Sequence, residues 1–247
     1  MTKQALNWTH WRNFFAARRH RPDVRLLANE PQLAGIPASL ARSLAIFQLG
    51  ESGGGTVVEQ ARRSRLPSAG EDYAEAVALF VAEEHRHAEL LACCVRALHG
   101  RLLDRNWTAR LFVSGRRLVG LRLKVTVLLA AEIVGICYYQ LLAGGLPDSE
   151  LRSVLREIAA DEKAHLRFHC DFLHAQMRTH LHRHLFVIGW RALMLAAALV
   201  VLIDHRAALR DLGIPPRRVW KRWALYSRTA EARIVAAERH AEPAYAH

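Results

Sequence analysis

Apolar residues recur at intervals of three and four along most of this chain, and the strict alternation of a half-buried strand is nearly absent. This period is typical of helices that bury one side. Breaks at the segments PSAG (67–70) and GGLP divide the pattern. Helices are expected over about residues 37–66, 71–98, 117–142 and 148–177, then in an apolar run at 186–203 and a basic segment at 219–240. We therefore predict an all-α protein with an N-terminal arm (1–36), a helical bundle (37–178) and a C-terminal helical extension (179–247).

Two of the expected helices carry acidic residues and histidines on their apolar side. The segment AEEHRHAE holds Glu84 and His87, and the segment ADEKAHLR holds Glu162 and His165. A separation of three residues places each pair on one helix face, about one turn apart. Charged groups on a buried face are costly unless something pairs with them. We therefore expect the two pairs to meet in the interior.

The other two helices each offer one carboxylate on the apolar side, Glu51 and Glu132. Counted from the intervening turn, Glu51 and Glu84 lie 16 and 14 residues away, and Glu132 and Glu162 lie 13 and 15 residues away. Because a helix rises by about 1.5 Å per residue, the members of each pair share one depth. Glu59 would lie about 12 Å from that depth, and we expect it in a surface ion pair with a neighbouring arginine.

Four carboxylates and two imidazoles at one depth would strongly perturb one another's pKa values, and divalent cations would relieve this. Glutamate and histidine donors suit iron or manganese better than a metal that prefers thiolates. Buried ion pairs alone would account for one Glu-x-x-His motif more readily than for two with depth-matched glutamates. The predicted metal ligands are Glu51, Glu84, His87, Glu132, Glu162 and His165.

The order Glu, Glu-x-x-His, Glu, Glu-x-x-His on four helices resembles the ferritin-like superfamily of di-iron carboxylate proteins, over about residues 37–178. The resemblance implies a ferritin-like four-helix bundle with a long crossover at 100–116 and two iron ions, with manganese as the alternative. It also implies that Glu84 and Glu162 bridge the metals while Glu51 and Glu132 are terminal ligands.

Three further residues belong to the predicted site. By the same resemblance, Glu83 and Asp161, which directly precede the two motifs, would hydrogen-bond the ligand histidines across the bundle and fix their tautomers. His169 lies one turn after His165 on the same face. It is open whether His169 is a third nitrogen ligand, a donor to a ligand or a buried histidine of the core; the 5.4 Å rise of a full turn favours a role other than direct ligation.

The function that we expect is an oxidoreductase that uses O2 to oxidise a small organic substrate. The alternatives are a ferroxidase or iron-storage protein, a manganese-type catalase, and a metal-dependent scaffold that binds a partner or a membrane through its basic tail. The basic extensions at both ends of the chain disfavour a storage cage.

Composition adds few constraints. The net charge is +12 with a pI near 10.4. Most of the basic residues are arginines, and no nucleic-acid-binding motif is present, so nucleic acid is not an expected partner. The apolar run at 186–203, which contains Arg191, fits a helix buried against the bundle or in a homodimer interface better than membrane contact. Four cysteines without metal-site spacing and an N-terminus without an apolar leader predict a cytoplasmic protein, with peripheral membrane association as the alternative.

Overall fold

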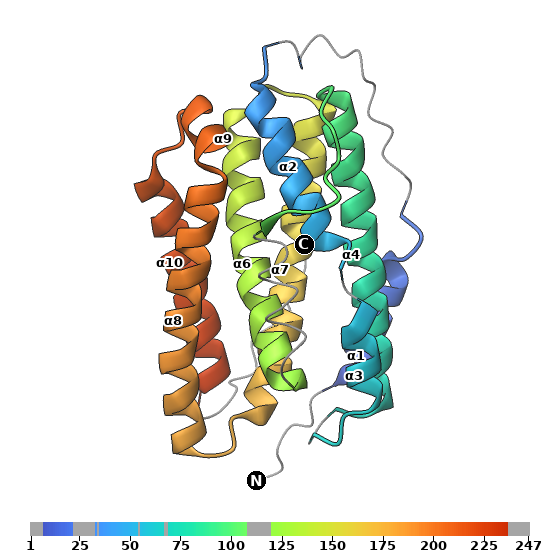
Figure 1. Ribbon diagram of the computed structural model, residues 1–247. Coiled ribbons are helices and arrows are strands. Elements are labelled where there is room, and N and C mark those ends of the chain that lie inside the picture. Colours follow the sequence, from blue (N-terminus) through green and yellow to red (C-terminus); the bar gives the residue numbers. More distant parts are fainter. Residues whose placement is uncertain are drawn as a thin grey trace.

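The regular elements of the protein are all helices in the computed structural model, which describes residues 7–21, 33, 35–53, 55–66, 69–107 and 120–236 (Figure 1). The prediction of an all-α protein is therefore confirmed. Parts of the arm, most of the expected crossover at 100–116, the start of the helix expected from 117 and the end of the chain lie outside the described residues. The helices are α1 (Trp8–Arg18), α2 (Ala38–Glu51), α3 (Gly55–Arg62), α4 (Glu71–Ala97), α6 (Leu121–Gly145), α7 (Glu150–Gln176), α8 (His180–Asp204), α9 (Arg206–Asp211) and α10 (Pro216–Val235).

The long helices α4, α6 and α7 lie side by side with α2 around a common apolar core (Figure 1). The most extensive packing is between α6 and α7 and between α2 and α4. Most residues of α6 are buried, so this helix runs through the centre of the molecule. The predicted start of α7 is confirmed, because the side chain of Ser149 accepts a hydrogen bond from the backbone N–H of Arg152 (3.3 Å) and caps the helix.

The helix expected over 37–66 is wrong as a single element, because it breaks after Glu51 and resumes as α3. The Ser52 hydroxyl donates to the carbonyl of Leu49 (2.9 Å), a local bond that closes the last turn of α2. Glycines follow directly, and their conformational freedom disfavours continuation of a helix. On α3, Glu59 forms the predicted surface ion pair, with Arg63 (2.6 Å).

The N-terminal arm packs against α4 through α1. Trp8, Trp11 and Phe15 are buried. The indole N–H of Trp11 donates to Asp171 of α7 (3.0 Å), which ties the arm to a second helix of the core. This docking brings Arg18, at the end of α1, and Arg21 over Glu83 of α4 and Asp161 of α7.

The C-terminal helices α8 and α10 pack along α6 and α7 on the side opposite α4 (Figure 1). Trp190 of α8 is buried and donates its indole N–H to the carbonyl of Ser227 on α10 (3.2 Å). By length and composition, α6 and α8 could each cross a membrane, but 89% of the apolar window of α6 is buried inside the protein against 28% for α8. The prediction that the run at 186–203 is buried therefore holds for only one face of α8.

Candidate metal centre

The two Glu-x-x-His motifs face one another across α4 and α7, as their spacing predicted. One possible ligand atom from each of Glu84, His87, Glu162 and His165 lies within 4.8 Å of the others. All four side chains are buried, and both histidines are fully enclosed. Two carboxylates and two imidazoles of this kind could hold a metal ion.

Each histidine points one ring nitrogen at the glutamate of the opposite motif. His87 Nδ1 lies 3.2 Å from Glu162 Oε1, and His165 Nδ1 lies 3.0 Å from Glu84 Oε1. These four atoms are buried, and among the described residues none of them has a partner aligned for a hydrogen bond. Because buried polar atoms in proteins are rarely left without a partner, the four atoms fit a bound cation better than they fit one another.

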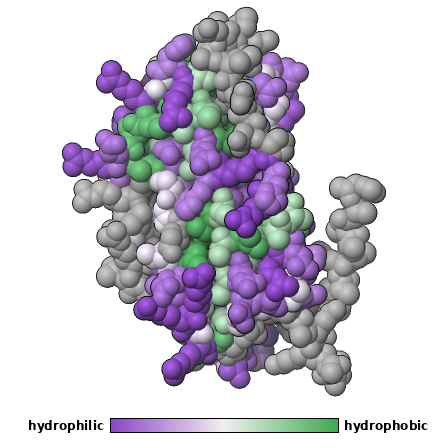
Figure 2. Space-filling view, turned by 90° about the vertical axis from the view of Figure 1, so that its right-hand side faces the viewer, coloured by the Kyte–Doolittle hydropathy of each residue, from purple (hydrophilic) through white to green (hydrophobic). Residues whose placement is uncertain are grey.

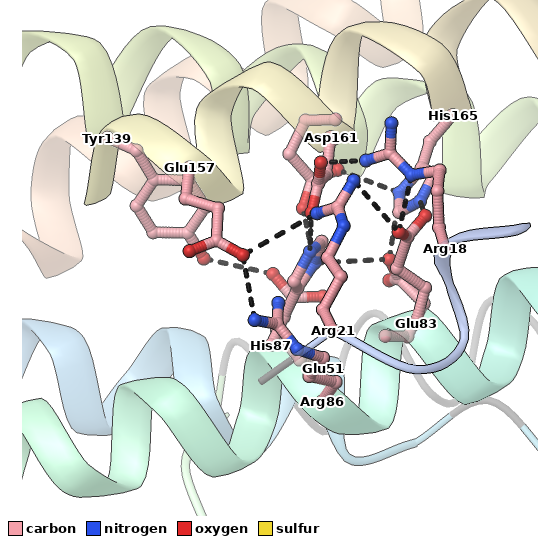
Figure 3. Close-up of polar contacts among 12 residues, drawn as sticks. Arg18, Arg21, Glu51, Glu83, Arg86, His87, Tyr139, Glu157, Asp161 and His165 are labelled. Carbon is pink, nitrogen blue, oxygen red and sulfur yellow. Dashed lines mark hydrogen bonds and ion pairs between the residues drawn. The ribbon is translucent and has the colours of Figure 1, made fainter. Parts of the chain in front are cut away.

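The other ring nitrogen of each histidine is bonded to the acid that precedes the opposite motif (Figure 3). His165 Nε2 lies 2.9 Å from Glu83 Oε2, and His87 Nε2 lies 3.2 Å from Asp161 Oδ2. A carboxylate can only accept, so each Nε2 carries the proton. Burial favours the neutral imidazole of His165, but the surrounding carboxylates outweigh it and raise its pKa well above the usual value. A bound cation would therefore take the place of the proton on Nδ1, the nitrogen that faces the interior.

Two arginines of the N-terminal arm cover these outer acids, and sequence reasoning missed them. Arg18 donates to Glu83 through Nε (2.8 Å) and also bonds Asp161, and Arg21 donates to Asp161 Oδ2 (2.6 Å) (Figure 3). Burial opposes ionisation of Glu83, but the bonds from His165 and Arg18 outweigh it and lower the pKa of this carboxyl to about 2. The signal in the sequence was the run of arginines directly after an aromatic helix.

Glu51, the carboxylate predicted on the first helix, is the last residue of α2. It lies against the tyrosine hydroxyl of Tyr139, which donates to its Oε1 (2.9 Å). Burial, together with the charges of Glu84 and Glu162, raises the pKa of Glu51 well above its usual value. The structure therefore brings Glu51 to the cluster and keeps Glu59 away from it.

Glu132 of α6 lies beside two histidines of α7. Its Oε2 lies 3.6 Å from His165 Nδ1, and its Oε1 lies 3.3 Å from His169 Nε2. Burial and the charges of Glu162 and Glu84 raise the pKa of Glu132 well above its usual value. Four of the six predicted ligands thus form the tight group, and Glu51 and Glu132 lie beside it.

His169 makes the two halves of the site unequal. It is buried, and burial together with nearby His165 lowers its pKa to about 3, so the imidazole is neutral. The equivalent position on α4, four residues after His87, is Leu91. An additional nitrogen donor therefore lies on the Glu132 side of the cluster, while the Glu51 side has a tyrosine hydroxyl.

A small cavity adjoins the cluster at the break between α2 and α3. Its volume is about 20 Å³, enough for one water-sized molecule. Lys124 is buried at this cavity, and its ammonium group donates to the hydroxyl of Thr56 (3.0 Å). The cavity is bordered by Glu51, Gly53, Thr56, Phe80, Glu84 and Lys124.

Comparisons of this chain with protein-family models, with curated proteins and with solved structures found no match. Function must therefore be inferred from the chemistry of the buried site itself.

Proposed function

We propose that this chain is a di-metal carboxylate protein of the ferritin-like type that uses O2 to oxidise a small organic substrate. The observation that carries the proposal is the repeated cross-helix arrangement, in which each motif's histidine faces the other motif's glutamate and is held from behind by the acid before it. Such a repetition supplies matching donors for two ions, with iron as the preferred metal and manganese as the alternative.

The roles of the ligands follow from their positions. Glu84 and Glu162 each lie near both imidazoles and are suited to bridge two ions, while Glu51 and Glu132 lie outside this group and are suited to bind one ion each. Two ferrous ions bound there would supply electrons for the reduction of O2.

Aromatic residues shield the centre from water on the side of the N-terminal arm. The rings of Phe15 and Phe80 lie 5.8 and 4.8 Å from the ring of His165. A dry surrounding strengthens the electrostatic interactions of the ligands and protects a reactive centre from side reactions. Tyr139 holds Glu51 in place, and the cavity, which Phe80 also borders, gives a small molecule access to Glu51 and Glu84.

His169 favours substrate oxidation over simple iron handling. A neutral nitrogen donor beside Glu132 makes the two metal positions chemically unequal, which is useful where one position must hold an oxidant in a defined orientation.

The small volume of the cavity favours a second candidate, iron oxidation by O2 without an organic substrate, because a water-sized space admits O2 but no larger molecule.

The rate of O2 consumption separates these functions. The full chain is loaded with two equivalents of Fe(II) without air, then mixed with buffer containing O2. Sustained uptake only after a reductant and small aromatic or aliphatic substrates are added supports an oxygenase. Sustained uptake with Fe(II) alone supports a ferroxidase, and turnover of peroxide by the manganese-loaded chain supports a catalase. Absence of all three activities in a metal-loaded chain would contradict the proposed enzymatic function.

A further inference from the structure

The helix α8 exposes a continuous apolar row to solvent. The large residues of this row are three, four or seven positions apart, as expected for one face of a helix, and extend over about 33 Å at 1.5 Å per residue. Each is at least half exposed. The row consists of Leu181, Leu185, Ile188, Leu195, Leu199 and Ile203.

The chain itself does not cover this row among the described residues, because α8 uses its opposite face for packing. Trp190, Met194 and Val201 are buried on that face against the rest of the protein. Single exposed leucines are common on soluble proteins, but a contiguous apolar patch of this length marks a surface that contacts something else. The face of the molecule on the α4 side instead carries mainly hydrophilic side chains, with smaller apolar areas between them (Figure 2).

Charge is nearly absent from the row. Between Leu185 and Ile203, Arg191 is the one charged side chain of α8 in the sequence, and it lies at the edge of the row. Its guanidinium group forms two bonds to Glu231 of α10 (2.7 and 2.9 Å), which draw it toward the neighbouring helix. The row is therefore bordered on this side by α10.

The surroundings of the row are strongly basic. Residues 178–236 contain 11 lysines and arginines against 3 aspartates and glutamates, a net charge of 11 − 3 = +8 out of +12 for the chain. Arg217, Lys221 and Arg228 of α10 are exposed, and Arg206 and Arg210 follow the end of α8. An apolar strip flanked by cations fits a surface that offers both hydrocarbon and negative charge.

We propose that α8 and α10 form a docking face for an anionic lipid bilayer, with α8 lying in the plane of the membrane. The apolar row would enter the boundary between headgroups and acyl chains, and the cations of α10 would meet the headgroups. A second copy of the chain is disfavoured as the occupant of this face. Two apposed copies would bring together two segments (178–236) that each carry a net charge of +8. A spanning orientation is disfavoured because the basic α10, packed along α8, would be drawn into hydrocarbon.

Sedimentation with vesicles tests this proposal on the purified full chain, with or without metal. The chain should bind vesicles of phosphatidylcholine and phosphatidylglycerol at least tenfold more tightly than vesicles of phosphatidylcholine alone, and less tightly at high salt. Leu199→Asp should lower binding at least tenfold. The matched control Leu102→Asp, at an exposed leucine after α4, should bind like the wild type, and circular dichroism should show both variants folded.

Substitution of Arg217 and Lys221 by glutamate should also weaken binding to the anionic vesicles, so the proposal does not depend on the folding of one variant. Three outcomes would overturn it: wild-type protein that ignores anionic vesicles, equal binding by folded Leu199→Asp, or glutamate variants that bind like the wild type. Sedimentation velocity in the absence of lipid gives the remaining check. A stable dimer that Leu199→Asp dissociates, without vesicle binding, would assign the face to a second copy instead.

Discussion

At the scale of single residues, each buried histidine of the site lies between two carboxylates that have different tasks. His87 has Asp161 at Nε2 and Glu162 at Nδ1, and His165 has Glu83 and Glu84 in the same relation. The outer acid fixes the tautomer and the inner one is a candidate ligand. This division of labour makes the outer acids testable separately from the ligands.

Glu83→Gln removes the negative charge that holds His165 and leaves the proposed ligands in place. We expect metal affinity to fall by about 10-fold to 100-fold, because partners of this kind orient a ligand histidine and raise its basicity. Titration against a chelator of known affinity measures this. The control is Glu75→Gln, at an exposed acid on the same helix. Equal affinity in the two variants would show that Glu83 serves packing alone.

His169→Ala tests whether the additional histidine binds a metal or acts on its neighbours. Its Nε2 lies 3.3 Å from Glu132 Oε1 without alignment for a hydrogen bond, and the rise of a full turn separates it from the predicted ligand His165. We expect the variant to keep its metal, by elemental analysis, and to lose at least tenfold in the rate of O2 consumption with substrate. Loss of one metal ion per chain would instead identify His169 as a ligand.

At the scale of elements, a buried polar link joins α2 and α6 to the junction of α8 and α9. Ser43 of α2 is hydrogen-bonded to Tyr138 of α6 and to Nδ1 of His205 (2.7 Å). Burial lowers the pKa of His205 to about 4, against the weaker opposing effect of Asp204. The protein therefore folds with a neutral histidine at this junction.

His205 should make the fold sensitive to mild acid. Between pH 6.5 and pH 4 the unfolded chain binds a proton that the folded chain excludes, so the free energy of unfolding falls as the pH decreases. We expect this histidine to contribute a loss of about 2 kcal/mol between pH 7.5 and pH 5. Urea denaturation of metal-free wild type and His205→Gln at both pH values measures the difference. The same loss in both proteins would contradict the expectation.

The connection after α4 packs closely on α2. A Cβ atom added at Gly100 would lie 2.7 Å from the Cβ of Ala41 and 3.0 Å from a methyl group of Val95. We expect Gly100→Ala to lower the free energy of unfolding by about 1–3 kcal/mol, as overpacking does. Gly144→Ala is the control, because a Cβ there meets nothing within 4 Å. Denaturation midpoints that are equal in the two variants would contradict this close contact.

At the scale of the whole molecule, local signals predicted much of the architecture. Helical periodicity predicted the long helices, and the capping residue Ser149 predicted the start of α7. Depth along the helices separated Glu51 from Glu59, because rise per residue is nearly constant in a helix. The break after Glu51 was not predicted, because the apolar period continues on both sides of the glycines.

Contacts between helices that are far apart in the sequence could not be predicted from the local pattern of apolar and polar residues. Arg18 and Arg21 reach the site only because α1 packs on α4, and nothing in their own segment indicates which acids they meet. The half-exposed state of α8 has the same origin. Apolar residues lie on both the buried and the exposed face of α8, so hydropathy alone could not show which face would pack against the core.

Metal stoichiometry is the most direct test of the central claim, that six interior side chains of four helices form one di-metal site. Wild type, Glu84→Ala and Glu59→Ala are loaded with Fe(II) without air, desalted and examined by elemental analysis. We predict about two ions per chain in the wild type and in Glu59→Ala, and fewer than one in Glu84→Ala. Equal metal content in all three proteins, or no retained metal in any of them, would contradict the account.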